Sequence, residues 1–263
     1  MPETDLDLLV QAAKASGDIA KTYFGNTPQV WEKADDAGPV TAADLAVNEM
    51  LERELQRARS TYGWLSEETE DHADRLGTDS LFVVDPIDGT RAFIAGSRDW
   101  AHSIAVVTNG AVTAGVVYLP MRDLMFTATL GGGAFLNGAR LDVSQNTDLA
   151  KATVLSSKVN FEGRFWNSGE TPIFKRHFRS SLAYRLSLVA QARFDAMLTL
   201  RPTWEWDIAA GALIVTEAGG TVSDHCGGPL RFNNIVPQVA GVVAAGPIHA
   251  ELVAGIAPLA PSA

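Results

Sequence analysis

The sequence predicts an α+β fold, in which helices at both ends of the chain bracket a central region of strands. Apolar residues recur at helical spacing near the N-terminus, at Leu6, Leu9, Val10, Ala13 and Ala20. Short apolar runs between turn signals begin at residue 81, and a strongly apolar helical stretch follows at 208–218. At 263 residues the chain can bury a large core. We expect a single domain, and a division into two lobes would fall at about 1–147 and about 148–263.

The two N-terminal helices are predicted from their start and stop signals. Gly25, Asn26 and Pro28 close the first helix. Thr41-Ala42-Ala43-Asp44 has the Ser/Thr-x-x-Asp/Glu pattern of a capping box and announces a second helix. This helix continues through apolar residues at Leu45, Val47, Leu51 and Leu55.

The strand region and the later helices follow in order. Strand-like runs occur at 81–84, 103–107 and 112–119. Asn137-Gly138 predicts a two-residue hairpin turn, because both residues accept positive φ angles. Helices are expected at 182–192 and at 208–218, where Gly219-Gly220 forms a stop signal. A lobe boundary, if one exists, is expected between Ser144 and Ala152, and the tail after Ile256 is expected to fray.

Composition narrows the class of protein. The formal net charge of -10 argues against a protein that binds a nucleic-acid polymer through its phosphates. A small phosphate ester remains compatible with this charge if bound metal ions supply the local positive charge. The single Cys226 forms no intramolecular disulfide, and residues 1–20 lack the basic and apolar pattern of a signal peptide. We therefore expect a cytoplasmic protein without a membrane partner.

The segment Asp85-Pro86-Ile87-Asp88-Gly89-Thr90 carries the functional hypothesis. Its two aspartates lie three residues apart, directly after an apolar strand, so that one turn can direct both carboxylates at one cation. Mg²⁺ prefers oxygen ligands and uses a few carboxylates together with substrate phosphate. On local grounds the alternative remains that Asp85 and Asp88 only shape the turn and cap the following helix.

Residues 85–93 resemble the Asp-Pro-(Ile/Leu)-Asp-Gly-Thr-x-x-Phe signature of the inositol monophosphatase superfamily. Further motifs occur in the order typical of that family, namely Lys33, Val40-Thr41-x-x-Asp44, Glu67-Glu68, Trp206-Asp207-x-Ala209-Ala210-Gly211 and Glu217-Ala218-Gly219-Gly220. The resemblance covers roughly residues 5–245. It implies a layered α/β/α/β/α sandwich of the inositol monophosphatase and fructose-1,6-bisphosphatase type.

The resemblance also implies which residues form the site. The metal ligands would be Glu67, Asp85, the Ile87 carbonyl, Asp88 and Asp207, holding two or three Mg²⁺ ions in a lithium-sensitive phosphatase. Asp44 and Thr90, with Glu67, would orient and deprotonate the attacking water. The substrate would contact Gly89, Thr90, Arg91, Ala183, Thr203 and Asp207.

Some of these assignments have competing structural explanations. Asp44 also completes the capping box, and Asp207 would be an excellent N-cap for the helix that follows it. Glu67 lies in a polar run that is ordinarily a surface loop. In addition, Ser66 occupies the position where the family usually has glycine.

The substrate is predicted from the segment before Asp207. Inositol monophosphatases typically carry a carboxylate seven residues before this aspartate, where the chain has Leu200. Leu200-Arg201-Pro202-Thr203-x-x-Trp206-Asp207 instead resembles the corresponding stretch of bacterial 3'(2'),5'-bisphosphate nucleotidases, which convert adenosine 3',5'-bisphosphate to AMP and phosphate. Arg91-Ala92-Phe93 departs from the Lys-Glu-Phe usual in nucleotidases.

We therefore expect a small phosphorylated metabolite as substrate, with a bisphosphate nucleotidase as the first hypothesis. Inositol-1-monophosphatase and histidinol-phosphate or another sugar phosphatase remain alternatives. A regulatory binding protein with a vestigial site is the alternative from a different class. The frequent dimers of the family suggest a possible homodimer.

Overall fold

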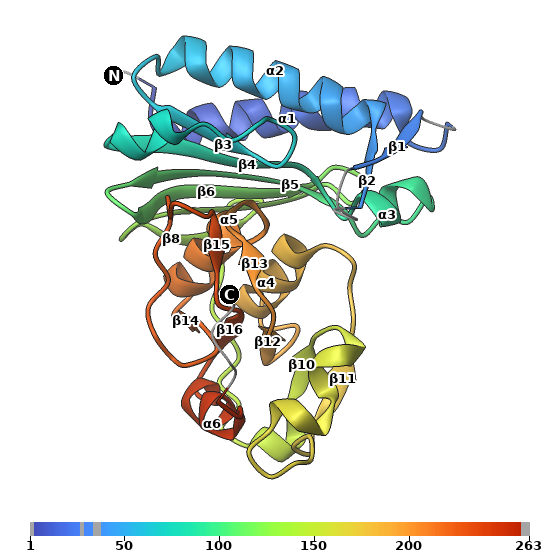
Figure 1. Cartoon of the computed structure of the whole chain (residues 1–263), viewed down its shortest axis with the longest axis vertical. Coiled ribbons are helices and arrows are strands. Elements are labelled where there is room, and N and C mark those ends of the chain that lie inside the picture. Colours follow the sequence, from blue (N-terminus) through green and yellow to red (C-terminus); the bar gives the residue numbers. More distant parts are fainter. Residues whose placement is uncertain (1–2, 27–28, 34–37, 259–263) are drawn as a thin grey trace.

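The computed structural model describes residues 3–26, 29–33 and 38–258. The elements form five layers in the order helices, sheet, helices, sheet, helix, as Figure 1 shows. The layered α+β sandwich expected from the resemblance is thus confirmed.

The first two layers are built from the N-terminal half of the chain. Helices α1 (Asp5–Tyr23) and α2 (Ala42–Ala58) pack against one face of a seven-stranded sheet. The strands of this sheet lie in sequence order and are β3 (Gly63–Ser66), β4 (Ser80–Asp88), β5 (Ala101–Thr108), β6 (Ala111–Leu119), β7 (Leu124–Thr129), β8 (Gly133–Leu136) and β9 (Ala139–Arg140). All neighbouring pairs are antiparallel except β3 and β4, which run parallel.

The remaining layers come from the C-terminal half. Helices α4 (Leu182–Ala190) and α5 (Glu205–Glu217) lie between the first sheet and a five-stranded second sheet. The second sheet has the order β11 (Lys175–His177), β10 (Thr153–Leu155), β12 (Ala196–Thr199), β16 (Val242–Ala245) and β14 (Thr221–Ser223). Helix α6 (His249–Gly255) covers its outer face.

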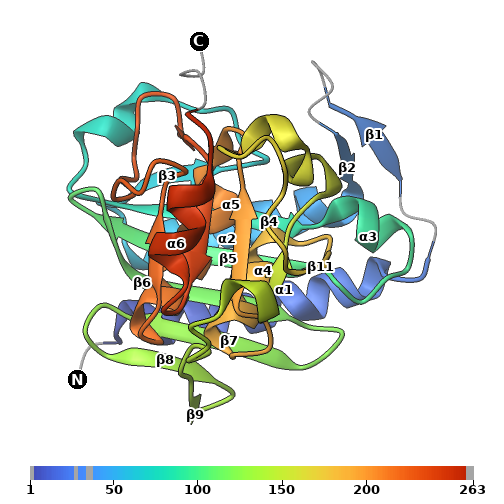
Figure 2. The ribbon, with the colours of Figure 1, turned by 90° about the horizontal axis from the view of Figure 1, so that it is seen from below.

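Short elements complete the chain around these layers. Two small antiparallel pairs are β1 (Val30–Glu32) with β2 (Pro39–Thr41), and β13 (Thr203–Trp204) with β15 (Gln238–Val239). Helix α3 (Thr90–Ile94) follows β4 and packs beside the β1–β2 pair, as the view in Figure 2 shows. Single 3₁₀ turns are η2 (Ala73–Gly77), η3 (Leu149–Lys151), η4 (Lys158–Phe161) and η5 (Gly163–Phe165).

Three hydrophobic cores join the five layers. One core joins α1 and α2 to the first sheet, a second surrounds α4 and α5 between the sheets, and a third joins the second sheet to α6. The middle core takes residues from both halves of the chain, including Phe126 and Ile214. The division into two lobes stays a prediction. No helix in the described ranges combines the length and the apolar character needed to cross a membrane.

The local signals in the sequence are largely confirmed. Thr41 caps α2 with a complete capping box, and Asn137-Gly138 forms the hairpin turn with φ angles of 48° and 83°. Helix α4 ends two residues earlier than expected, at Ala190. Pro28 and the last five residues of the tail lie outside the described ranges.

Helix α5 contradicts one alternative considered for Asp207. The helix begins at Glu205, three residues before the start expected at Ile208, and its N-cap is Trp204. Asp207 therefore lies inside the first turn instead of capping the helix. Its carboxylate is not needed to satisfy the N-cap position.

Close backbone packing sets the position of α5 on the first sheet. At Gly115 in β6, an added Cβ would lie 3.0 Å from the Cα of Ala210 and 3.2 Å from its carbonyl oxygen. Glycine at this position lets the helix approach the sheet directly. The location of Asp207 depends on this approach, because Asp207 and Ala210 belong to the same helix.

Replacing Gly115 with alanine should separate α5 from the sheet. We expect Gly115→Ala to lower the free energy of unfolding by about 1–3 kcal/mol, the usual cost of overpacking. Gly77→Ala is the matched control, because no atom lies within 4 Å of its added Cβ. Chemical denaturation measures both, and equal stabilities for the two variants would contradict the packing argument.

Candidate active site

A bulge in β4 brings the first two carboxylates to one side of the strand. Along β5, Asp85 pairs with Ser103 and Asp88 pairs with Ala101, so three residue steps on β4 oppose two on β5. Side chains normally alternate between the faces of a strand, and the extra residue cancels that alternation. Pro86 fits this bulge because it has no N–H group to donate to the ladder.

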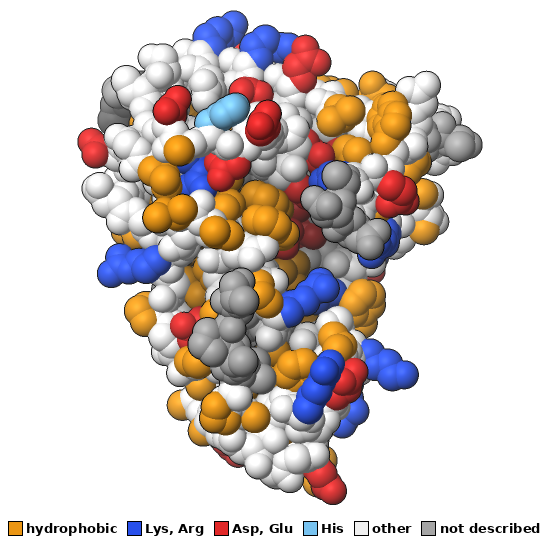
Figure 3. All heavy atoms as spheres, in the orientation of Figure 1, with side chains coloured by type: hydrophobic (Ala, Val, Ile, Leu, Met, Phe, Trp, Pro, Cys, Tyr) orange, Lys and Arg blue, Asp and Glu red, His pale blue; other side chains and the backbone are white. Residues whose placement is uncertain are grey.

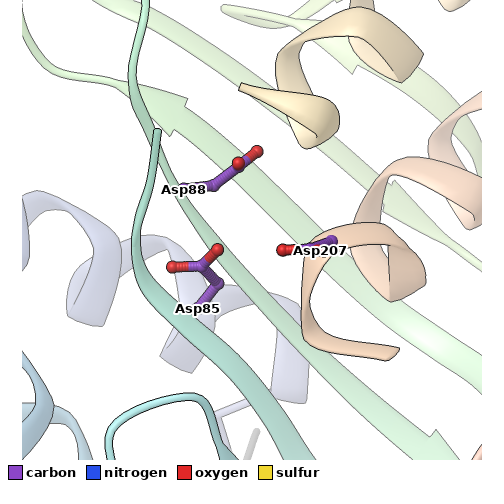
Figure 4. Close-up of side chains that lie close together, drawn as sticks. All are labelled: Asp85, Asp88 and Asp207. Carbon is purple, nitrogen blue, oxygen red and sulfur yellow. The ribbon is translucent and has the colours of Figure 1, made fainter. Parts of the chain in front are cut away.

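The third carboxylate comes from a distant part of the sequence. Asp207 lies in the first turn of α5, and Figure 4 shows its side chain facing Asp85 and Asp88 across the space between helix and strand. Ligand oxygens from the three aspartates all lie within 4.8 Å of one another. These residues, which the sequence analysis assigned to the metal site, are thus brought together.

Burial makes this cluster electrostatically unfavourable without a cation. Burial raises the pKa of Asp85 well above its ordinary value, and the nearby charges of Glu67 and Asp88 raise it further. Burial likewise raises the pKa of Asp207, with Asp88 again contributing. The pKa of Asp88 is raised to about 6, mainly by burial. A cation among the three would relieve the repulsion that raises these values.

The donor set fits Mg²⁺. Oδ1 of Asp85 is buried and has no hydrogen-bond partner among the described residues. A buried polar atom without a hydrogen-bond partner is costly in free energy. A metal ion bound between this oxygen and the other two carboxylates would supply the missing partner. Asp85, Asp88 and Asp207 are the residues that would hold the ion.

Asp44 serves its helix and the site with different oxygens. Its Oδ2 accepts hydrogen bonds from the backbone N–H and the hydroxyl of Thr41, which completes the capping box of α2. Its Oδ1 accepts a hydrogen bond of 3.2 Å from the hydroxyl of Thr90. Burial raises the pKa of Asp44 to about 6. The capping and catalytic explanations of this residue are therefore compatible.

Glu67 lies near the cluster but is paired with a lysine. It follows β3, where its N–H donates to the Val84 carbonyl beside the end of β4. Lys33 bridges Glu67 and Glu68, with Nζ–Oε1 distances of 2.7 and 2.6 Å. Burial, and then the charge of Glu67, raise the pKa of Glu68 to about 7. Glu67 therefore does not belong to the group of three converging carboxylates formed by Asp85, Asp88 and Asp207.

Ser66 is part of a buried hydrogen-bond chain that supports this loop. Its hydroxyl donates to Oδ1 of Asn48 at 2.6 Å, and the Asn48 amide donates to the hydroxyl of Thr69. Asn48 lies on α2, one turn beyond Asp44. The serine that departs from the family pattern thus connects the Glu67 loop to the helix that carries Asp44.

The turn after β4 requires glycine and contacts α4. Gly89 has a φ of 100°, a left-handed conformation that disfavours a side chain.

Asp88 Oδ2 accepts hydrogen bonds from the Ser181 hydroxyl and from the Ala183 N–H, both at 2.6 Å. Ala183 is fully buried behind Asp88, so it contributes a backbone donor to the site and is absent from the lining of the cleft.

The other predicted residues are placed as follows. Gly89, Thr90, Arg91, Thr203 and Asp207 line a cleft of about 790 Å³, and Glu67 and Asp88 line it too. The Ile87 side chain is buried in the core under α1 and α2, and its carbonyl accepts a hydrogen bond from Thr90. Figure 3 shows carboxylates on the floor of a hollow, with basic side chains beside them.

Sequence reasoning missed several residues of this cleft. Ser181 could have been found as the polar residue before an apolar helix, but its bond to Asp88 depends on tertiary packing. Arg185 and Arg201 also line the cleft. No local sequence signal distinguishes these two arginines from surface residues.

Comparisons with known proteins all point to one family. The model of the inositol monophosphatase family matches residues 1–261. An inositol-1-monophosphatase from Rhizobium meliloti is 36% identical over 247 residues, covering 88% of this chain and 90% of the relative. The Escherichia coli protein named Nus factor SuhB is 38% identical over 242 residues, with 85% and 86% covered.

A solved structure extends the agreement to three dimensions. The Thermotoga maritima IMPase superposes with a TM-score of 0.81 at 31% identity, and the match covers 94% of each chain. Members of this family are Mg²⁺-dependent hydrolases of phosphoric monoesters. Since the family model, the sequence relatives and the fold all agree, this chain belongs to the inositol monophosphatase family of magnesium-dependent phosphatases.

Proposed function

We propose that the cleft hydrolyses a small phosphate monoester, with Asp85, Asp88, Asp207, Glu67 and the Ile87 carbonyl as metal ligands. The convergence of the three aspartates, of which Asp88 and Asp207 line the cleft, carries this proposal. When bound, Mg²⁺ supplies the positive charge that draws a phosphate group to an acidic cleft and makes a nearby water more acidic.

Thr90 and Asp44 form the proton path of the proposed reaction. The Thr90 hydroxyl donates to Asp44 Oδ1, which leaves the lone pairs of the hydroxyl available to a water in the cleft. As the water attacks phosphorus, Thr90 takes its proton and passes its own to Asp44. The raised pKa of Asp44, about 6, suits a general base that works near neutral pH.

We propose that Glu67 exchanges its salt bridge with Lys33 for a bond to the metal ion. Its carboxylate lines the cleft and is held by Lys33. Swinging from Lys33 toward the ion would add a fourth carboxylate to the ligand set, with Lys33 remaining on Glu68. Gly89, Thr90, Arg91, Thr203 and Asp207, which line the cleft, are proposed to form the substrate contacts around the reacting phosphate, whereas the N–H of Ala183 donates to Asp88.

Two substrates are compared as candidates for this cleft. The relative from Rhizobium meliloti is named an inositol-1-monophosphatase, which favours inositol 1-phosphate. Against this, Leu200 is 5% exposed and packs in the outer core, so this position offers inositol no hydrogen-bond acceptor. The comparisons give no specific support for a bisphosphate nucleotidase.

An aromatic wall favours the nucleotide. Trp204 and Trp206 line the cleft and stack on each other, with ring centroids 4.7 Å apart and planes 9° apart. Trp204 is 40% exposed, so a planar base could stack beside it. Adenosine 3',5'-bisphosphate therefore stays beside inositol 1-phosphate as a proposed substrate.

A substrate panel tests the function. Phosphate release from adenosine 3',5'-bisphosphate, inositol 1-phosphate and histidinol phosphate is measured as kcat/KM with Mg²⁺ and with chelator. Turnover that requires Mg²⁺ supports the proposal, and the ranking selects the substrate. Absence of turnover on every ester would favour the regulatory alternative, to which the relative named Nus factor SuhB also points.

Asp85→Asn separates the metal role of this residue from any structural role. The change keeps the shape of the side chain and removes one charge from a buried cluster, so metal-free stability should stay equal or rise. We expect kcat/KM to fall at least about 100-fold, the scale of losing a positioned electrostatic group. The exposed Asp18→Asn is the charge-matched control. A variant with near-wild-type activity at low Mg²⁺ would refute the assignment.

Thr90→Val tests the proton path without disturbing the capping box. Valine keeps the shape but cannot relay a proton, so kcat should fall by about 100-fold or more while KM changes less. Thr90→Ser restores the hydroxyl and should recover most of the rate. Equal rates for the valine and serine variants would exclude the relay.

The stabilising effect of Mg²⁺ should grow with pH. The pKa values of Asp44 and Asp88 are raised to about 6 in the metal-free fold, so the folded state binds more protons than the unfolded chain between pH ~4 and pH 6. Metal-free stability contributed by these groups therefore falls as pH rises through this window. Buried His102, whose pKa is lowered to about 4, acts in the opposite direction.

The difference between two melting curves isolates the carboxylates, because His102 contributes to both. We expect the increase in Tm caused by Mg²⁺ to be larger at pH 7.5 than at pH 5, since protons and metal compete for the same oxygens. A Tm increase that is independent of pH would show that the buried carboxylates do not bind the ion.

A further inference from the structure

Two arginines in the cleft form no salt bridge with a described carboxylate. Arg185 and Arg201 both line the cleft beside Asp207. Neither forms an ion pair with any acidic group among the described residues. Guanidinium groups match phosphate with several donors in a fixed geometry, and this makes unpaired arginines in a cleft candidates for anion binding.

Arg185 is held rigidly by neutral groups. It is only 7% exposed, its Nε donates to the Arg179 carbonyl at 2.6 Å, and its guanidinium lies 4.7 Å from the centre of the Phe178 ring. Ser181, the N-cap of α4 four residues earlier, binds Asp88. Arg185 is therefore fixed next to the metal cluster, with its charge uncompensated by any direct ion pair to a described residue.

Arg201 reaches the same space from the second sheet. It lies in the link between β12 and β13, where its neighbour Leu200 points into the outer core. Burial lowers the pKa of Arg185 to about 10, and the proximity of Arg201 contributes to this change. Two guanidinium groups that repel each other are stabilised when an anion binds between them.

A metal ion at the three aspartates would further favour binding of an anion beside the two arginines. Asp88 and Asp207 are the acidic groups that attract Arg185 through the cleft. A Mg²⁺ ion held by those carboxylates would offset their negative charge, so that the surroundings of the two arginines would be more positive. The reacting phosphate belongs at the metal cluster, so the arginines are available to a different group.

We propose that Arg185 and Arg201 form a subsite for a second phosphate group of the substrate, so that the enzyme prefers bisphosphorylated esters over the corresponding monophosphates. This inference rests on the proposed phosphatase function. It applies equally to nucleoside and sugar bisphosphates, because the arginines recognise the anion and not the ring.

Substrate pairs that differ by one phosphate test the subsite. Suitable pairs are adenosine 3',5'-bisphosphate with adenosine 3'-monophosphate, and fructose 1,6-bisphosphate with fructose 1-phosphate. We expect the wild-type kcat/KM for at least one bisphosphate to exceed that of its partner by about tenfold or more, consistent with charge-assisted hydrogen bonds. The difference should appear mainly in KM, because the second phosphate is bound before and during the reaction.

Arg201→Gln is the principal variant, because this residue is exposed and the change should not affect folding. In this variant the ratio of kcat/KM for the bisphosphate to kcat/KM for the monophosphate should fall toward one, whereas Arg201→Lys should keep part of the preference. Arg185→Lys should also reduce the preference. Arg193→Gln is the matched control, since Arg193 is exposed outside the cleft, and its preference should equal that of the wild type.

Three outcomes would overturn the subsite. These are a wild-type ratio near one for both pairs, a ratio unchanged in both cleft variants, and equal losses for monophosphate and bisphosphate. The last result would mean that the arginines contact the reacting phosphate itself.

A binding measurement separates this inference from the proposed function. Calorimetric titration of the same pairs in Ca²⁺, which takes oxygen ligands as Mg²⁺ does, reports affinity without turnover. Tighter binding of the bisphosphate that is lost in Arg201→Gln supports the subsite even if no ester is hydrolysed. Equal binding of both partners by the wild type overturns it even if hydrolysis occurs.

Discussion

Repulsion among buried carboxylates is the constraint on which the arrangement of this molecule depends. Ligand oxygens of Asp85, Asp88 and Asp207 lie within 4.8 Å of one another, although burial raises all three pKa values and neighbouring carboxylates raise those of Asp85 and Asp207 further. A flexible chain would move these groups apart. Here the β4 bulge holds two of them, and the close contact of α5 with Gly115 holds the third. The layered core therefore supplies the rigidity that keeps an unfavourable cluster ready for Mg²⁺.

Several site residues stabilise secondary structure and serve the site at the same time. One oxygen of Asp44 caps α2 while the other accepts the Thr90 hydroxyl. Asp88 accepts a hydrogen bond from the Ala183 N–H at the start of α4 while facing the metal cluster. A carboxylate has enough lone pairs for both tasks. This sharing links the geometry of the site to the ends of the helices, so that a shift of α2 or α4 would change the position of a reactive oxygen.

The distribution of charge in the cleft explains how an acidic protein can accept an anionic substrate. Carboxylates occupy the floor of the cleft, where a cation reverses their effect, and basic side chains lie beside it. Lys33 is engaged by two glutamates, whereas Arg185 and Arg201 are not engaged by any described carboxylate. The net charge of -10 is therefore a poor guide to the potential that a phosphate ester meets. Local positions of ions and arginines decide that potential.

The sequence by itself determined the helices α1 and α2, the main strands of the first sheet and the Asn137-Gly138 turn, because capping, periodicity and turn preferences act over a few residues. The metal role of Asp85 and Asp88 was predicted from the resemblance to the family, since the local pattern alone also fits a turn. The short strands of the second sheet were not predicted from such patterns, since their pairing joins segments far apart in the chain. The start of α5 was misplaced because Trp204 and Glu205 carry no strong capping signal. The resemblance implied that Asp207 and Asp85 share one site, and the tertiary structure brings them together. Only the tertiary structure decided that Ser181 supports Asp88 and that two arginines line the same cleft. These relations depend on how layers pack, and no local spacing in the sequence encodes them.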